Sequence, residues 1–385
     1  MGHCIGPEVT RPVDQVLSRP QGGHMIFLEY QNTMELILAN PRGFCAGVYM
    51  AIDVVDQLLE ICPEEPIFVY HEIVHNKHVV DRFREEGVTF VDDLQEVPSG
   101  SICVFSAHGV SPALRKEAAE RNLTAIDATC PLVTKVHAEA VRYARKGYQI
   151  LLIGHADHQE VIGTRGEAPE AMQVVEAAED IPGLNILDPK KLVYLTQTTL
   201  SMDDAEVIIQ ALKGAFPEIK SPPSDDICYA TTNRQIAVRA IAPDCDLVLV
   251  VGSITSSNSL RLTEISEGLG TRAILIDDKS ELKSEWFEGI NRVLITAGAS
   301  APEHLVKDLI LHMIDEYGGE VEQRDVSQEA VEFGLPGTLK HFMRSRGIDP
   351  SGRRIQMDKT ASIDSFLDGH GIAHRRVDLT VSANG

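Results

Sequence analysis

The feature of this chain that most constrains its fold is a regular alternation of short apolar runs with longer amphipathic stretches, from residue 34 to about residue 320. The apolar runs are rich in β-branched residues and predict strands, whereas the amphipathic stretches predict helices. The predicted strands are Glu35–Ala39, Pro66–Tyr70, Ser101–Phe105, Ala125–Ala128, Gln149–Ile153, Leu192–Leu195, Asp246–Val251, Ala273–Ile276 and Arg292–Thr296. The predicted helices include Pro131–Lys146, Met202–Phe216, Asn233–Ala242, Ser257–Leu269 and Pro302–Tyr317. This alternation is typical of α/β domains with mainly parallel sheets.

The charge balance excludes some classes of partner. Asp and Glu number 57 against 35 Lys and Arg, so the formal net charge is −22. Broad nucleic-acid binding and docking on anionic membranes both need clustered cations, and we expect neither. No apolar run approaches the roughly 18 residues of a membrane span, and the first residues lack the pattern of a secretory signal. We therefore expect a cytoplasmic protein, whose seven scattered cysteines are thiols or metal ligands.

Three cysteines suggest how the chain is divided. Cys45, Cys130 and Cys228 each stand where a strand passes into a helix, and they are separated by 85 and 98 residues. This spacing predicts one cysteine in each of three similar α/β domains, over residues 34–129, 130–226 and 227–326. Residues 1–33 are then an N-terminal extension, and residues 327–385 a C-terminal segment of unknown role.

The same three cysteines suggest a cofactor. The N-terminus of a helix favours a thiolate, and three thiolates could hold one iron–sulfur cluster. Because a [4Fe–4S] cluster normally takes four cysteines, one iron would stay open to substrate. Ordinary buried cysteines are the alternative, and the spacing alone does not decide between the two.

Neutral hydrogen-bond donors follow several of the predicted strands. They could hold a diphosphate without Lys or Arg, although Ser257 and Asn258 could equally cap the helix that follows them. These donors are His75, His108, Ser256, Ser257, Asn258 and Ser300. Glu160, in a loop after another strand, could deliver a proton, or it could be an ordinary solvated carboxylate.

One motif suggests a different chemistry. His71-Glu72-Ile73-Val74-His75 matches the zinc-peptidase pattern, in which a helix places both histidines on one face. Here the motif directly follows a predicted strand, and β-branched Ile73 and Val74 favour a strand end or loop. A zinc hydrolase is kept as a competing hypothesis.

Several segments together resemble a known family, the 4-hydroxy-3-methylbut-2-enyl diphosphate reductases (LytB/IspH family). The resemblance covers residues 34 to 335, in order and at the family's spacing. It is carried by Ala39-Asn-Pro-Arg-Gly-Phe-Cys-Ala-Gly47, His71-Glu-Ile-Val-His-Asn76, Phe105-Ser-Ala-His-Gly109, Asp127-Ala-Thr-Cys-Pro-Leu-Val-Thr-Lys-Val-His137, Thr196-Gln-Thr-Thr-Leu-Ser201, Asp225-Asp-Ile-Cys-Tyr-Ala-Thr-Thr-Asn-Arg-Gln235, Ser256-Ser-Asn-Ser259 and Ala297-Gly-Ala-Ser-Ala-Pro302.

This resemblance implies a fold, a cofactor and a reaction. The fold would be three α/β domains in a pseudo-three-fold arrangement around a central cluster. That cluster would be [4Fe–4S], which can be isolated as [3Fe–4S], on Cys45, Cys130 and Cys228. The reaction would be reductive dehydroxylation of 4-hydroxy-3-methylbut-2-enyl diphosphate to isopentenyl and dimethylallyl diphosphate, the last step of the non-mevalonate route. A ferredoxin or flavodoxin would supply the electrons.

The resemblance also implies roles for single residues. Glu160 would be the proton-relay acid, and Thr198 would stand beside the substrate hydroxyl. The substrate would be bound by His75, His108, His158, Ser256, Ser257, Asn258, Ser300 and, as a weaker match, Thr231. A non-catalytic iron–sulfur protein is the remaining alternative, although such a protein would not need this set of residues.

Overall fold

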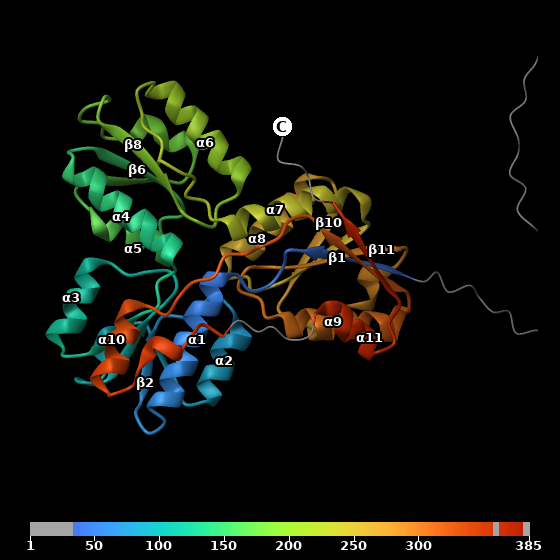
Figure 1. The fold of residues 1–385 in the computed structure, drawn as a ribbon. Helices are drawn as coiled ribbons and strands as arrows, with labels where there is room; N and C mark the ends of the chain where they lie inside the picture. Colours follow the sequence, from blue (N-terminus) through green and yellow to red (C-terminus); the bar gives the residue numbers. More distant parts are fainter. Residues whose placement is uncertain (1–33, 357–361, 380–385) are drawn as a thin grey trace, which may run out of the picture. The chain divides into compact units, whose positions relative to one another are not determined.

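The computed structural model describes residues 34–356 and 362–379, so the predicted extension over residues 1–33 lies outside the described residues. Three β-sheets of six, four and three strands are present (Figure 1), and every strand pairing in these ranges is parallel. The fold is therefore α/β with parallel sheets, as predicted. In the described part of the chain, no helix is long and apolar enough to cross a membrane.

The six-stranded sheet has the order β10-β9-β11-β1-β12-β13. Its strands are β1 (Glu35–Asn40), β9 (Leu247–Val251), β10 (Arg272–Ile276), β11 (Arg292–Ala297), β12 (Glu320–Asp325) and β13 (His374–Asp378). Helices α9 (Glu303–Tyr317) and α11 (Ile363–Gly369) pack on one face, and α7 (Tyr229–Ile241) and α8 (Ser257–Gly268) pack on the other. All five residues of β9 are buried, as expected for a parallel strand covered on both faces.

The four-stranded sheet has the order β3-β2-β4-β5. Its strands are β2 (Ile67–Tyr70), β3 (Thr89–Val91), β4 (Ile102–Phe105) and β5 (Thr124–Asp127). Its main core is formed with α1 (Ala46–Ile61), α2 (Lys77–Glu85) and α10 (Gly337–Ser345), and α3 (Pro112–Glu120) covers the other face.

The three-stranded sheet has the order β7-β6-β8. Its strands are β6 (Gln149–Ile153), β7 (Met172–Val175) and β8 (Leu192–Thr196). Helices α4 (Pro131–Arg145) and α5 (Gln159–Glu167) pack on one face, and α6 (Met202–Ala215) packs on the other.

All nine predicted strands are present, each within one residue of its predicted ends. The predicted helices are also present, although α7 begins at Tyr229 rather than at Asn233. Four strands were not predicted. β3 has only three residues, and β7 buries only its two end residues. β12 buries Glu322, Gln323 and Arg324 beside a single apolar residue, Val321. β13 is an edge strand with no buried residue, so it lacks the apolar pattern of a strand.

The sheets do not follow the predicted domain boundaries. β1 was assigned to the first domain, but it pairs with β11 and β12 in the six-stranded sheet, where Leu36 and Leu38 join the core. The physical reason is burial, because these apolar side chains are covered between α9 and the rest of that sheet. The C-terminal segment also divides, since α10 packs against the four-stranded sheet and β13 extends the six-stranded one.

Candidate functional site

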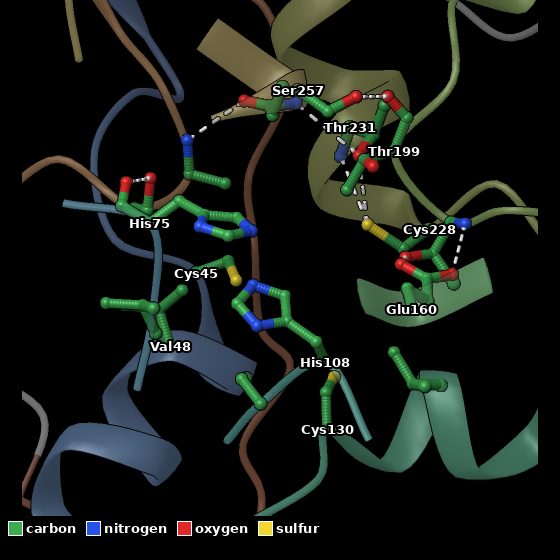
Figure 2. Close-up of a pocket in the computed structure, with 18 of the residues that line it drawn as sticks. Cys45, Val48, His75, His108, Cys130, Glu160, Thr199, Cys228, Thr231 and Ser257 are labelled. Carbon is green, nitrogen blue, oxygen red and sulfur yellow. Dashed lines mark hydrogen bonds between the residues drawn. The ribbon is translucent and has the colours of Figure 1, made fainter. Parts of the chain in front are cut away.

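One pocket collects the residues that follow the carboxyl ends of the strands (Figure 2). Strands of all three sheets lead into it, which is where ligands of open parallel sheets bind. All the predicted site residues line this pocket: Cys45, His75, His108, Cys130, His158, Glu160, Thr198, Cys228, Thr231, Ser256, Ser257, Asn258 and Ser300. Their proximity follows from the structure, whereas their individual roles stay predictions.

Each of the three cysteines is the N-cap of a helix. Cys45 precedes α1, Cys130 precedes α4 and Cys228 precedes α7. Only Cys228 accepts a capping hydrogen bond through its sulfur, from the backbone N–H of Thr231 at 3.4 Å. The sequence prediction that these thiols stand at strand-to-helix junctions is therefore confirmed for Cys45 and Cys130. It is wrong for Cys228, which precedes α7 in the connection from helix α6.

Close packing around Gly47 shows how near two of the thiols lie. A Cβ atom on Gly47 would stand 2.6 Å from the Cys130 sulfur and 3.8 Å from the Cys45 sulfur. Burial, with a smaller contribution from the neighbouring Cys45, raises the pKa of Cys228 to about 11. Burial likewise raises the pKa values of Cys45 and Cys130. A pocket that holds three partly buried thiols together favours a positively charged metal centre, which stabilises their thiolates.

Three histidines form one side of the pocket. The rings of His75 and His108 are stacked with centroids 4.1 Å apart, and the ring of His158 meets both edge-on. Burial lowers the pKa of His158 to about 4, with a further contribution from the positive charge of His75. Burial also lowers the pKa of His108 well below its usual value. His108 and His158 are therefore neutral at pH 7 in the ligand-free pocket.

Small hydroxyl and amide side chains also line the pocket, and Ser257, Thr199 and Thr231 lie close to one another in it (Figure 2). Ser256 is the N-cap of α8 and its hydroxyl lies 3.2 Å from that of Ser300, which also bonds to the His75 carbonyl at 2.9 Å. The Asn258 side-chain oxygen accepts from the Ala299 N–H at 2.9 Å. The bond from Ser300 to His75 ties loops of two different sheets together. The N-cap of α8 is Ser256, rather than Ser257 or Asn258, to which the capping alternative had been assigned.

Glu160 is held by a single partner. It stands at the start of α5 and is only 3% exposed. One carboxylate oxygen accepts from the Thr198 N–H at 2.7 Å, and the other accepts from the Thr198 hydroxyl at 2.8 Å. Burial raises the pKa of Glu160 to about 7, although the hydrogen bonds from Thr198 oppose this shift. The alternative of a solvated loop carboxylate is therefore wrong.

Sequence reasoning missed two groups of residues around the pocket. The first is an apolar wall, in which each member directly neighbours a predicted residue or a cysteine loop: Val48, Val74, Ala107, Leu132, Val133 and Ala299. The second supports the cysteines. Arg234 is fully buried and donates to the carbonyls of Gly43 and Ala230 and to the carboxylate of Glu329. The only available signal for the wall was its position next to the motif residues.

The zinc-peptidase motif does not have the geometry that its chemistry needs. Residues 71–76 form a bent, irregular segment rather than a helix. His71 pairs with Asp92 at 2.8 Å outside the pocket, whereas His75 lies inside it. The two histidines are therefore used separately, and the zinc-hydrolase hypothesis loses its structural basis.

The chain is similar to known proteins over most of its length. The family model described as LytB protein matches residues 36–314. A protein of Rhodopirellula baltica named 4-hydroxy-3-methylbut-2-enyl diphosphate reductase is 54% identical over 80% of this chain and 97% of its own length. A protein of Nocardia farcinica with the same name is 52% identical over 80% of this chain and 92% of its own length.

Solved structures agree with these sequence matches. The E-1-hydroxy-2-methyl-but-2-enyl-4-diphosphate reductase from Plasmodium falciparum superposes with a TM-score of 0.79 and 41% identity. The superposition covers 82% of this chain and 99% of that structure. The fold, the length of the match and the level of identity lead to one conclusion: the chain belongs to the LytB family.

Proposed function

We propose that this protein converts 4-hydroxy-3-methylbut-2-enyl diphosphate into isopentenyl and dimethylallyl diphosphate, the last step of the non-mevalonate pathway. The observation that carries the proposal is the content of one pocket. It combines three helix-capping thiols, a buried carboxylic acid and a set of neutral hydrogen-bond donors. The relatives that cover 80% of the chain are named for this reaction.

The three cysteines would hold a [4Fe–4S] cluster. When bound, such a cluster supplies electrons one at a time and, with three thiolates, leaves one iron able to act as a Lewis acid. The overall reaction consumes two electrons and two protons. One C–O bond breaks, one C–H bond forms, and the hydroxyl oxygen leaves as water.

Glu160 and Thr198 would deliver protons. With a pKa of about 7, Glu160 carries a proton in a substantial fraction of molecules at neutral pH. A hydroxyl group both accepts and donates, so Thr198 can take the proton of Glu160 while passing its own to the departing hydroxyl. The Thr198 N–H then remains to stabilise the carboxylate that forms. Proton delivery of this kind typically contributes about 10²- to 10⁴-fold to the rate.

The histidines and the hydroxyl groups would hold the diphosphate. Among the described residues no Lys or Arg lines the pocket, so we expect the neutral donors to bind the anion together with histidines that take up protons when it binds. The serines at the start of α8 also present a helix N-terminus, which favours an anion. The apolar wall, which includes Val48 and Val74, would pack against the five-carbon chain.

Electrons must come from outside, because no nucleotide motif is present in the sequence. A ferredoxin or flavodoxin is the kind of protein that would supply them. The cytoplasmic location expected from the sequence stays a prediction.

The first experiment measures iron and acid-labile sulfide in anaerobically purified protein, with EPR spectra recorded with and without substrate. We expect about four irons per chain, a spectrum that changes with substrate, and both products when reduced methyl viologen supplies electrons. Zinc in place of iron after anaerobic reconstitution would overturn the cluster assignment. If the EPR spectrum of the cluster does not change with substrate and no product forms, the protein is instead a non-catalytic iron–sulfur protein.

A further inference from the structure

We infer that the groove along α4 is the docking surface for a small, acidic, one-electron carrier protein. We call this feature the α4 groove. It is lined by Arg115, Thr134, His137, Ala138, Val141, Arg142, Arg145, Lys146 and Glu167. This inference rests on the proposed function, because it concerns how electrons reach that same site.

The first turn of α4 separates the groove from the pocket. Leu132 and Val133 line the pocket, whereas Thr134 lines the groove. Thr134 is exposed, and both its backbone N–H and its hydroxyl bond to the carbonyl of Cys130, at 2.9 and 3.2 Å. The groove therefore ends at a residue that is hydrogen-bonded to one of the three cysteines. One helical turn, about 5.4 Å, is a short distance for an electron to cross.

The groove is positively charged although the chain is acidic. Four of its lining residues are cations, Arg115, Arg142, Arg145 and Lys146, and one is a carboxylate, Glu167. That carboxylate is already paired with Arg115 at 3.0 Å and with His137 at 2.9 Å. The chain as a whole has a net charge of −22, so a groove with four cations is a positive patch on an otherwise acidic protein.

The cations at the end of α4 are available to a partner. Arg145 and Lys146 are exposed, and neither forms an ion pair with another residue in the described ranges. The surface continues to Lys191, whose ammonium would lie 3.9 Å from a Cβ on Gly147. The nearby carboxylate of Glu139 is buried and does not reach the surface.

These features fit an electron-carrier protein better than a small anion or a nucleic acid. Long, unpaired and exposed cations do not form a closed site for a small anion. A nucleic acid would be repelled by the rest of the chain. Electron-transfer partners, in contrast, use small interfaces of opposite charge that form and dissociate quickly. Each visit would deliver one electron, so two visits and two protons complete the cleavage of the C–O bond.

The test compares two charge reversals with two electron donors. The groove variant is Arg145→Glu/Lys146→Glu. The control is Lys213→Glu/Arg344→Glu, which changes the net charge equally at the ends of α6 and α10. Activity of the holoenzyme is measured with a reduced plant-type ferredoxin, and separately with reduced methyl viologen. Because methyl viologen is a cation, losing positive charge does not weaken its approach.

We expect the groove variant to lose about tenfold in kcat/KM for ferredoxin at low salt, and less at 0.5 M NaCl. Its rate with methyl viologen should not fall, and the control should keep at least half its rate with both donors. An equal loss in the control, no loss at low salt, or an equal loss with both donors would overturn the docking assignment. Failure of the proposed function is distinguishable, because the unmodified protein would then be inactive with methyl viologen.

Discussion

Glu160 and Thr198 form a two-point contact, in which the N–H and the hydroxyl of Thr198 bond to different oxygens of the Glu160 carboxylate, at 2.7 and 2.8 Å. The two residues follow β6 and β8, which are neighbouring strands of one sheet. The sheet therefore fixes the position of the carboxyl group in the pocket, and Thr198 fixes its orientation.

Glu160→Gln should separate proton delivery from substrate binding. Glutamine can still accept from the Thr198 N–H, but it cannot donate an acidic proton. We expect kcat to fall by about 10²-fold or more, while the substrate dissociation constant and the EPR spectrum of the cluster change little. Glu139→Gln, which alters a buried carboxylate outside the pocket lining, is the control and should stay active. Loss of cluster in Glu160→Gln, or near-normal turnover, would contradict the assigned role.

The pH dependence of turnover should report the same group. Burial raises the pKa of Glu160 to about 7, so the protonated form that donates is abundant below pH 7 and is lost as the pH rises through that value. A bound diphosphate adds negative charge and moves the pKa higher still. We expect kcat to decline at pH values above about 7, with a slope of up to tenfold per unit. Rates from pH 6 to 9 with methyl viologen as donor check this, and a flat profile in that range would exclude Glu160 as the acid.

Features that depend on a local sequence pattern could be predicted, whereas features that depend on contacts between distant segments could not. Cys45 and Cys130 were placed correctly because a strand-to-helix junction is a local pattern. The pairing of β1 with β11 was not predictable, because chain order does not reveal which strands share a sheet. Strand β12 was missed since its buried residues include Glu322 and Arg324, which neutralise each other. Arg234 was missed for a similar reason, because an arginine in a helix usually faces solvent.

The same contrast between local patterns and distant contacts applies to the candidate site. Each polar loop could be recognised by itself, but the residues alone did not show that the loops meet in one pocket. The resemblance to a family supplied that expectation, and the pocket lining agrees with it. The α4 groove could not be foreseen, because Arg115 and Arg145 come from different helices that only the fold brings together.

Gly47→Ala should damage the metal site while favouring the helix that carries it. Alanine is normally better than glycine inside a helix by about 0.5–1 kcal/mol. At this position, however, the new Cβ would stand 2.6 Å from the Cys130 sulfur. We expect iron per chain after anaerobic reconstitution to fall to less than half of that in the unmodified protein. Gly214→Ala in α6, where a Cβ meets nothing within 4 Å, is the control and should bind iron normally. Full iron content in Gly47→Ala would contradict the inferred thiol packing.

Substrate binding should take up protons. The pKa of His158 is lowered to about 4 in the free pocket, and a bound diphosphate raises it. At pH values between the pKa of His158 in the free protein and its higher pKa in the complex, the affinity for substrate falls as the pH rises. The fall is up to tenfold per pH unit for each proton taken up. Calorimetry of the oxidised holoenzyme at pH 7.5, in buffers of different ionisation enthalpy, counts these protons. We expect net uptake, which should decrease in His158→Asn and stay unchanged in His71→Asn, a histidine outside the pocket. Binding without proton uptake would contradict this role.

Arg234 and Glu329 connect two of the cysteine loops. Arg234 donates to Gly43, two residues before Cys45, and to Ala230, two residues after Cys228, and its charge is balanced by Glu329 at 2.9 Å. Arg234→Met removes the guanidinium from the Gly43 carbonyl and leaves the mostly buried Glu329 carboxylate with only the neutral Asn233 amide, so we expect a loss of about 3–5 kcal/mol in the free energy of unfolding. Urea unfolding of the cluster-free protein measures this loss. The holoprotein should also bleach faster in air, as followed by visible absorbance. Arg346→Gln breaks an exposed pair with Glu65 and should change neither property appreciably. If Arg234→Met proved no less stable than Arg346→Gln, this buried connection would not be what holds the cysteine loops together.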